Sequence, residues 1–482
     1  MSRPLRSLGS VIGSRSRFRR EVAVSSVTSI GIYALGLLTG PLIAHALGPS
    51  GRGALAAVVV PSALLAWAVA FGLPLAAAYH VGDRTDSELL GTASVFGIVV
   101  GVPVAAGLWF VCPSYLAEHS ATTLFWARAF LVAVPFSVGS QAALEMLRRR
   151  AADRTWNAWR ASPFAVTAVL LVLLAATGRL TLEAAFAASF LGVNTPVLLL
   201  VRMLWDLRPI RASVGVLRTM LPYAWRTAAA GSANSVTARL DQVLLAATVR
   251  PSQLGLYAVA VTASSASNPL TAGISLALFG NQRDEADRGR ASARFRRSVL
   301  ATLLISSGVA VLLGAFAPLL LRLAFGGGFA AATTPRRILL VGQVALDLVY
   351  ALSTALYADG RPGEASRVAV LGAVTTIGGL VLLVPRWGIT GAAVVTTVAN
   401  VGQLAYLSLR LTKGSAPEGV AASTTSSSLS TTDDVENQRS AADLALRRAP
   451  SGSAPTEAIP ATTAADTAAG VYSENTCDRA ST

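Results

Sequence analysis

Charged residues are scarce in this chain of 482 residues, since they make up 13% of the sequence and hydrophobic residues make up 53%. Soluble domains carry about 25% charged residues, so the composition excludes a sizeable soluble domain. Histidine is rarer still, with three copies in the whole chain. His45, His80 and His119 are isolated from one another, so we expect no metal site and no cofactor.

Long apolar runs fill residues 22–412 instead. A membrane-spanning helix needs ~20 mostly apolar residues, because each backbone N–H and C=O group must be satisfied within the segment. The sequence therefore predicts an all-α polytopic membrane protein with about twelve transmembrane helices. The predicted spans are Val22–Leu47, Ala54–Tyr79, Leu89–Val111, Leu124–Glu145, Ser162–Thr177, Leu182–Met203, Ala224–Thr248, Gly255–Gly280, Ser298–Leu323, Ile338–Ala358, Ala365–Val384 and Ile389–Leu411.

Arginine is distributed unevenly over the gaps between these spans. The even-numbered gaps hold clusters such as residues 148–150 and 283–297, whereas most odd-numbered gaps hold a single arginine, for example Arg52 or Arg250. Positive charge accumulates on the cytoplasmic side, so both termini are predicted to be cytoplasmic. The exception is the ninth gap, which holds Arg322, Arg336 and Arg337.

The net charge of +15 comes from these short loops rather than from a folded basic domain. Nucleic acid is therefore not an expected partner, whereas membrane lipids are. No predicted outer loop is long enough to hold a large catalytic region, which disfavours an integral-membrane glycan polymerase or transferase.

The two halves of the apolar region carry a similar motif in the same place. Residues 49–56 (PSGRGALA) recur as residues 251–258 (PSQLGLYA), each time between the first and second spans of a six-span block. This repetition predicts two six-helix lobes related by a pseudo-twofold axis along the membrane normal. Because Pro-Ser and Gly are also general signals at helix starts, an independent origin of the two motifs stays open.

Composition and repeats together predict the domain organisation. After residue 412 the chain is rich in Ser, Thr, Ala and Pro and cannot bury a core, so a disordered tail is expected. The predicted parts are a basic cytoplasmic N-terminus (1–21), an N-lobe with six spans (22–203), a cytoplasmic linker (204–223), a C-lobe with six spans (224–412) and a disordered cytoplasmic tail (413–482).

Several short motifs follow one another in a characteristic order. They are residues 47–53 (LGPSGRG), 239–242 (RLDQ), 255–260 (GLYAVA), 325–329 (FGGGF), 358–361 (ADGR) and 388–393 (GITGAA). In this order the chain resembles the Wzx-like flippases for polysaccharides or lipid-linked oligosaccharides, within the multidrug/oligosaccharidyl-lipid/polysaccharide exporter superfamily. The resemblance covers residues 22–412.

The resemblance implies a two-lobed transporter rather than an enzyme. Such a flippase moves a polyprenyl-pyrophosphate-linked oligosaccharide, or a related polysaccharide precursor, across the bacterial cytoplasmic membrane by alternating access. A lipid-linked glycan is then the substrate, and glycan-assembly proteins are left open as further partners. A drug/cation antiporter of the same superfamily is the nearer alternative, although the intramembrane arginines disfavour a cationic cargo.

Polar residues inside the seventh span are candidates for substrate binding. A charge at the bilayer centre costs ~2.5–3.5 kcal/mol on insertion scales, so such residues indicate a functional site. The candidates are Arg226, Arg239, Asn234 and Asp241. A guanidinium presents a planar fork of donors that suits pyrophosphate or an acidic sugar. At ~100° per residue, Arg239 lies on nearly the opposite side of the helix from the other three. Packing through interhelical hydrogen bonds is the alternative.

Further candidates line a coupling-ion site or a cavity. Gln343, Asp347 and Tyr350 form one stripe of the tenth span. Asp347 is predicted to couple transport to an ion or proton gradient, or to pair with an arginine of the seventh span. Glu145 stands at the cytoplasmic end of the fourth span, where interfacial snorkelling explains it equally well.

Three prolines lie inside predicted spans: Pro74, Pro196 and Pro269. Proline removes a backbone hydrogen bond and kinks a helix. These positions suit helices that bend during transport, although prolines are also common in spanning helices generally.

Overall fold

The computed structural model describes residues 5–150, 153–265, 288–358 and 362–413, with no side chains described for residues 5–23 and 229–238 and for further positions in the C-terminal half. All described residues belong to one compact unit, which ends at Lys413. The described residues form helices and no β-strand longer than an isolated bridge. The predicted all-α membrane fold class is therefore confirmed at this level.

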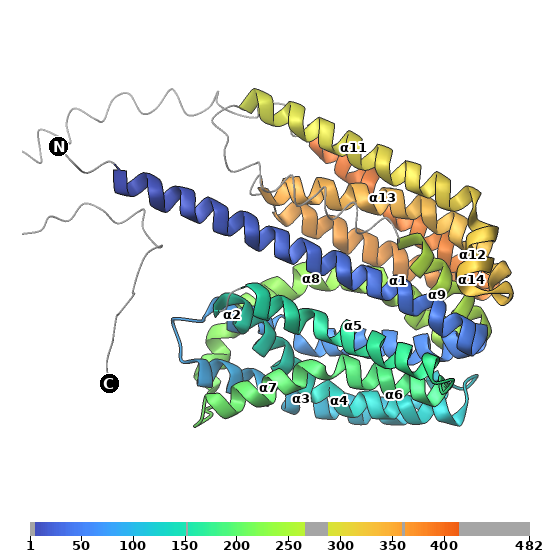
Figure 1. The fold of residues 1–482 in the computed structure, drawn as a ribbon, viewed down its shortest axis with the longest axis horizontal. Coiled ribbons are helices and arrows are strands. Elements are labelled where there is room, and N and C mark those ends of the chain that lie inside the picture. Colours follow the sequence, from blue (N-terminus) through green and yellow to red (C-terminus); the bar gives the residue numbers. More distant parts are fainter. Residues whose placement is uncertain (1–4, 151–152, 266–287, 359–361, 414–482) are drawn as a thin grey trace, which may run out of the picture. The chain divides into compact units, whose positions relative to one another are not determined.

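Long helices run side by side through the described unit (Figure 1). In chain order they are α1 (Leu5–Ala70), α2 (Leu73–Tyr79), α3 (Asp86–Tyr115), α4 (Ala121–Arg150), α5 (Asp153–Ala176), α6 (Leu182–Val193), α7 (Thr195–Asp206), α8 (Val214–Thr248), α9 (Pro251–Ser264), α11 (Arg288–Ala315), α12 (Ala317–Phe325), the 3₁₀ helix η3 (Gly327–Ala332), α13 (Thr333–Ala358) and α14 (Pro362–Lys413).

The two longest helices, α1 and α14, are each two helices joined at a glycine. Gly48 has φ of 65° and Gly388 has φ of 53°, in the left-handed region that glycine adopts without steric cost. At ~1.5 Å per residue, an unbroken α1 would be about 100 Å long, against ~30 Å of bilayer core. Both breaks fall between predicted spans.

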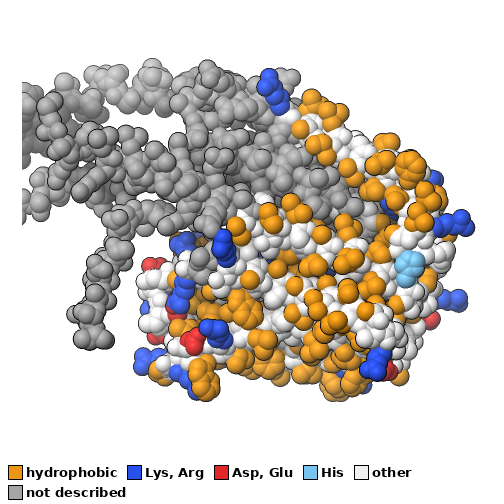
Figure 2. All heavy atoms as spheres, in the orientation of Figure 1, with side chains coloured by type: hydrophobic (Ala, Val, Ile, Leu, Met, Phe, Trp, Pro, Cys, Tyr) orange, Lys and Arg blue, Asp and Glu red, His pale blue; other side chains and the backbone are white. Residues whose placement is uncertain are grey.

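Six described helices are long and apolar enough to cross a membrane, or seven if the bent pair of α11 and α12 is one span. On the face drawn in Figure 2, apolar side chains cover the middle of the described unit and charged side chains gather near its two ends. Such a band is expected where lipid replaces water around the helices. The number of twelve spans stays a prediction.

Three predicted spans are interrupted within the described residues. The second breaks at Phe71 and Gly72, the sixth at Asn194, and the ninth at Phe316, where the chain bends by 74°. A proline stands in the first turn of the helix that follows each break: Pro74, Pro196 and Pro318. Pro74 and Pro196 thus mark breaks, as their positions indicated, whereas Pro269 lies outside the described residues.

The fifth helix begins earlier than predicted. The sequence placed Arg154 and Arg160 in a cytoplasmic gap, but α5 already starts at Asp153. Arg160 donates to the Ser29 hydroxyl over 2.7 Å and lies over the Trp156 ring. Contacts along α1 therefore continue the helix beyond the apolar run, and α5 begins nine residues before the predicted span.

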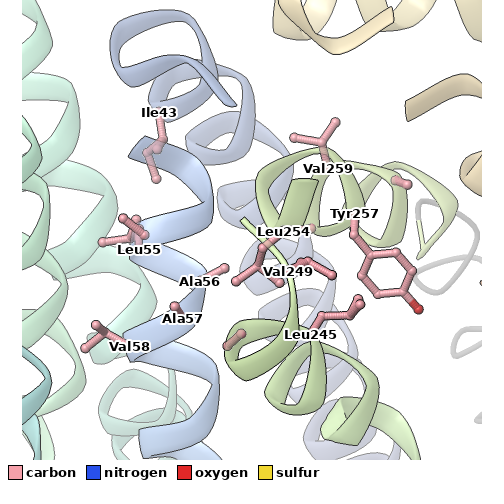
Figure 3. Packing of buried hydrophobic residues seen from close by; sticks show 14 of the residues in the cluster. Ile43, Leu55, Ala56, Ala57, Val58, Leu245, Val249, Leu254, Tyr257 and Val259 are labelled. Carbon is pink, nitrogen blue, oxygen red and sulfur yellow. The ribbon is translucent and has the colours of Figure 1, made fainter. Parts of the chain in front are cut away.

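The largest apolar core joins α1 to helices from both halves of the chain. In Figure 3, Leu55 and Val58 project from α1 away from α9, whereas Ala56 projects towards Leu254 of α9. Small residues on this face let α1 and α9 approach closely, which is how helices pack within membranes.

Candidate functional site

The two copies of the repeated motif touch each other. A Cβ atom added to Gly53 would meet the carbonyl oxygen of Pro251, and one added to Gly255 would meet the carbonyl oxygen of Pro49. We call this reciprocal backbone packing of residues 49–53 against residues 251–255 the repeat contact. Each copy therefore holds an equivalent place relative to the other, and only glycine fits at its centre.

Two further contacts join the N-terminal half of the chain to α8. The Tyr115 hydroxyl donates to the carbonyl of Val243 over 2.7 Å, and His119 Nε2 donates to the carbonyl of Ala246 over 3.3 Å. His119 lies in the loop between α3 and α4, and burial lowers its pKa, which the hydrogen bond to Ala246 and the charge of Glu118 partly offset. The repeat contact and these bonds lie at the predicted outer ends of their helices.

Helix α8 also packs against the N-terminal half at its other end. Met220 and Ala224 are fully buried among residues of α2, α3 and α4. Gly72 lies against the Ala224 carbonyl, where a side chain would clash. The preceding linker is fixed to α3, because the Ser87 hydroxyl donates to the carbonyl of Pro209 over 2.6 Å. Helix α8 thus connects the two halves along its length.

The predicted arginines of the seventh span lie on α8 and are exposed. Neither Arg226 nor Arg239 forms an ion pair with another described residue. The side chain of Asn234 lies outside the described residues. Exposed guanidinium groups retain their donors for an anionic ligand, since an arginine carries five N–H donors and no acceptor.

Asp241 is different, because only 3% of its surface is exposed. Its Oδ2 accepts hydrogen bonds from the Tyr257 hydroxyl at 2.5 Å and from the Thr396 hydroxyl at 3.4 Å, while Oδ1 accepts from the Gln242 amide at 2.7 Å. Figure 3 shows Tyr257 projecting from α9 with its hydroxyl directed away from α1. The carboxylate therefore joins α8, α9 and α14, and it is buried whereas Arg226 and Arg239 are exposed.

Asp347 lies in a second buried cluster, with 1% of its surface exposed. The Ser306 hydroxyl donates to its Oδ2, and Gln343 Nε2 donates to its Oδ1 over 2.8 Å. The structure thus brings the predicted pair Gln343 and Asp347 together. Glu145 lies apart from them, at the end of α4, where it forms an ion pair with Arg148 at 2.9 Å.

Sequence reasoning missed two arginines. Arg128 lies inside the predicted fourth span and stacks over the Trp109 ring at 4.9 Å. Arg336, which is 2% exposed, donates to the carbonyl of Ala317 at the break between α11 and α12. Arg128 could have been found from the sequence, because it is a charged residue inside a predicted apolar span. The role of Arg336 depends on the break between α11 and α12, which the sequence around Arg336 does not indicate.

A family model described as polysaccharide biosynthesis protein matches residues 18–281. The chain belongs to this family. No curated protein matches the chain significantly. The family predicted from the short motifs is therefore confirmed.

Solved structures with the same fold are membrane transporters. An inward-facing multidrug resistance MATE family transporter of the MOP superfamily matches with a TM-score of 0.63 and 14% identity, over 80% of this chain and 96% of that chain. The lipid II flippase MurJ in an inward closed conformation matches with a TM-score of 0.64 and 12% identity, over 81% and 87%. An outward-facing MATE transporter matches with a TM-score of 0.52 and 14% identity, over 82% and 96%. Family and fold agree with the predicted class of transporter or flippase.

Proposed function

We propose that the protein is a flippase that moves a lipid-linked oligosaccharide, or a related polysaccharide precursor, across the cytoplasmic membrane. Family membership supports polysaccharide synthesis as the context, and the fold supports transport rather than catalysis. The observation that carries the proposal is the pair of exposed arginines, Arg226 and Arg239, on a helix that packs against the N-terminal half of the chain near both of its ends. Guanidinium groups suit the pyrophosphate of such a cargo.

The alternative cargo class, cationic drugs, requires accessible carboxylates. Asp241 and Asp347 are both buried and accept hydrogen bonds from neighbouring side chains. Neither carboxylate is exposed to a cargo in this arrangement, whereas the arginines are. The distribution of charge therefore favours an anionic headgroup over a cation.

In the proposed architecture, twelve spans form an N-lobe (22–203) and a C-lobe (224–412), with linker 204–223, N-terminus 1–21 and tail 413–482 in the cytoplasm. The glycine breaks in α1 and α14 support this count, because each divides a helix too long for one span into two. The arginine-rich cytoplasmic gaps support the orientation.

The proposed mechanism alternates access across the repeat contact. The close packing of residues 49–53 against residues 251–255 supports a closed outer side, because both segments lie in predicted outer gaps. The headgroup is then accepted from the cytoplasmic side, and separation of the repeat contact releases it outwards. Asp241 and Asp347 are proposed to couple this motion to an ion or proton gradient, because each carboxylate joins two helices of the proposed C-lobe. Asp241 of α8 accepts from Thr396 of α14, and Asp347 of α13 accepts from Ser306 of α11.

Replacement of Arg239 by Ala tests the cargo site. We expect surface glycan export to be abolished while the protein still inserts into the membrane, because one of the two anion-binding groups is lost. Arg218→Ala is the matched control, since Arg218 is also exposed on α8 but precedes the predicted span. Export measured by surface glycan staining at equal membrane abundance reports the result, and unchanged export in the Arg239 variant removes this residue from the mechanism.

A further inference from the structure

An apolar groove of about 530 Å³ runs between α3 and α4, and its lining includes Trp109. It extends from Ile98 to Phe110 on α3 and from Leu131 to Phe136 on α4, and every residue that lines it is apolar. Phe110 is 81% exposed and Val132 is 58% exposed. In a membrane-embedded helix pair, such a groove faces lipid.

The inner end of the groove is a tight helix crossing. A Cβ atom on Gly101 would lie 2.8 Å from the Cα atom of Pro135, so the two backbones are in close contact there. Pro135 also interrupts the hydrogen-bond ladder of α4, which lets the helix bend. The groove runs from Ile98, one turn before this crossing, towards the outer ends of α3 and α4.

The outer end of the groove carries a cation. The guanidinium of Arg128 lies over Trp109, which is part of the groove lining, with 4.9 Å to the ring centroid. Its Nε is buried and has no hydrogen-bond partner among the described residues. No described carboxylate, including that of the nearby loop residue Glu118, forms an ion pair with it. The guanidinium of Arg128 therefore has no anionic partner among the described residues at the outer end of the apolar groove.

We propose that this groove binds an anionic phospholipid of the outer leaflet, with its phosphate on Arg128 and one acyl chain along α3 and α4. Arginine recognises phosphate through charge-assisted hydrogen bonds, and the apolar lining accommodates the chain. This site is separate from the proposed cargo route and does not depend on the identity of the cargo.

The length of the groove decides between a phospholipid and a longer isoprenyl carrier. From Ile98 to Phe110, α3 rises by about 18 Å at ~1.5 Å per residue. One leaflet of a bilayer core is about 15 Å thick, half of ~30 Å. The groove thus matches one acyl chain that enters from the outer leaflet and ends near Ile98, next to the Gly101 crossing.

Native mass spectrometry of the purified full-length protein tests this site, with equal amounts of phosphatidylglycerol and phosphatidylcholine added. We expect phosphatidylglycerol to be retained preferentially by the wild type. In the Arg128→Gln variant, the ratio of retained phosphatidylglycerol to retained phosphatidylcholine should fall about tenfold, which is the effect of removing one charge-assisted hydrogen bond. The Ala106→Trp variant, which fills the groove, should retain less of both lipids. Arg179→Gln in the loop after α5 and Val169→Trp on α5 are the matched controls and should behave as wild type.

Thermal unfolding of each variant in detergent is the control for folding, so that a loss of bound lipid can be distinguished from misfolding. Equal retention of the two lipids by the wild type would overturn the proposal, as would unchanged retention in Arg128→Gln. An isoprenyl phosphate that displaces phosphatidylglycerol at equal concentration would assign the groove to the cargo carrier instead, and would also overturn it.

Discussion

Two glycines carry the contact between the repeated motifs. An alanine at Gly53 or Gly255 would place its Cβ against backbone atoms, which have little freedom to move. We expect either substitution to destabilise the described conformation by about 1–3 kcal/mol, as overpacking does in cores. Gly36→Ala is the control, since no atom lies within 4 Å of a Cβ there. Thermal unfolding of the purified variants measures the difference, and equal midpoints for all three would show that the repeat contact is loose.

His119 makes the contact between α3 and α8 sensitive to pH. Burial lowers its pKa from the usual value of 6.5, so the folded contact favours the neutral ring. Its Nδ1 is buried without a partner among the described residues, and protonation would leave a charged donor unsatisfied there. The free energy of unfolding should therefore be highest above pH 6.5 and should fall as the pH drops below this value.

Unfolding measured between pH 7.5 and 5.5 tests this dependence on His119. The His119→Gln variant keeps a donor for the Ala246 carbonyl but cannot titrate, so its stability should change less over this range. The same pH dependence in both proteins would place the titrating group elsewhere.

The sequence identified which residues are unusual but not which ones meet. Asp241 was recognisable as a costly charge inside an apolar span. Its partners Tyr257 and Thr396 lie on other helices, and no local sequence pattern predicts these contacts. Arg226 and Asp241 share a helical face by periodicity, yet one is exposed and the other buried. Periodicity gives direction around a helix, whereas burial depends on what each turn packs against.

At the scale of elements, the Asp241 carboxylate ties α9 and α14 to α8. Tyr257→Phe removes its shortest side-chain bond, and Thr396 at 3.4 Å is a weak replacement. We expect a loss of about 1.5–3 kcal/mol in stability, the range for hydrogen bonds to charged groups. Tyr79→Phe is the control, because Tyr79 is largely exposed. Equal unfolding midpoints for the two variants would show that the bond contributes little.

Helix boundaries were predictable where a glycine or a charge interrupts the apolar pattern. Gly48 and Gly388 fall in predicted gaps and do separate helices. The break at Phe316 was missed, because apolar residues continue through it and hydropathy does not sense backbone direction. Arg336 and Arg337 donate to carbonyls of Ala317 and Gly314 around this break.

At the scale of the whole molecule, these bonds explain the exception to the charge asymmetry. Gly314 lies in the last turn of α11, where carbonyls lack intrahelical partners, and Arg337 satisfies this carbonyl at the negative end of the helix dipole. Arg336 and Arg337 of the ninth gap are therefore held by carbonyls at the ends of α11 and α12, which accounts for two of its three arginines. The remaining arginine clusters still support the proposed orientation.

The repeated motifs predicted two equivalent blocks from local sequence alone. That the two copies meet each other was not predictable, because contact between them depends on how distant helices pack. The family followed from the order of several short motifs, whereas the proposed cargo class rests on the exposure of Arg226 and Arg239, which only the structure provides.

The central claim is that the protein moves a lipid-linked glycan headgroup between leaflets. The most direct measurement places the purified full-length protein in liposomes with a fluorescent lipid-linked oligosaccharide in the inner leaflet and adds an impermeant quencher outside. We predict that fluorescence falls with the wild type and stays high with Arg239→Ala. Liposomes whose quenching does not exceed that of protein-free liposomes would contradict the account.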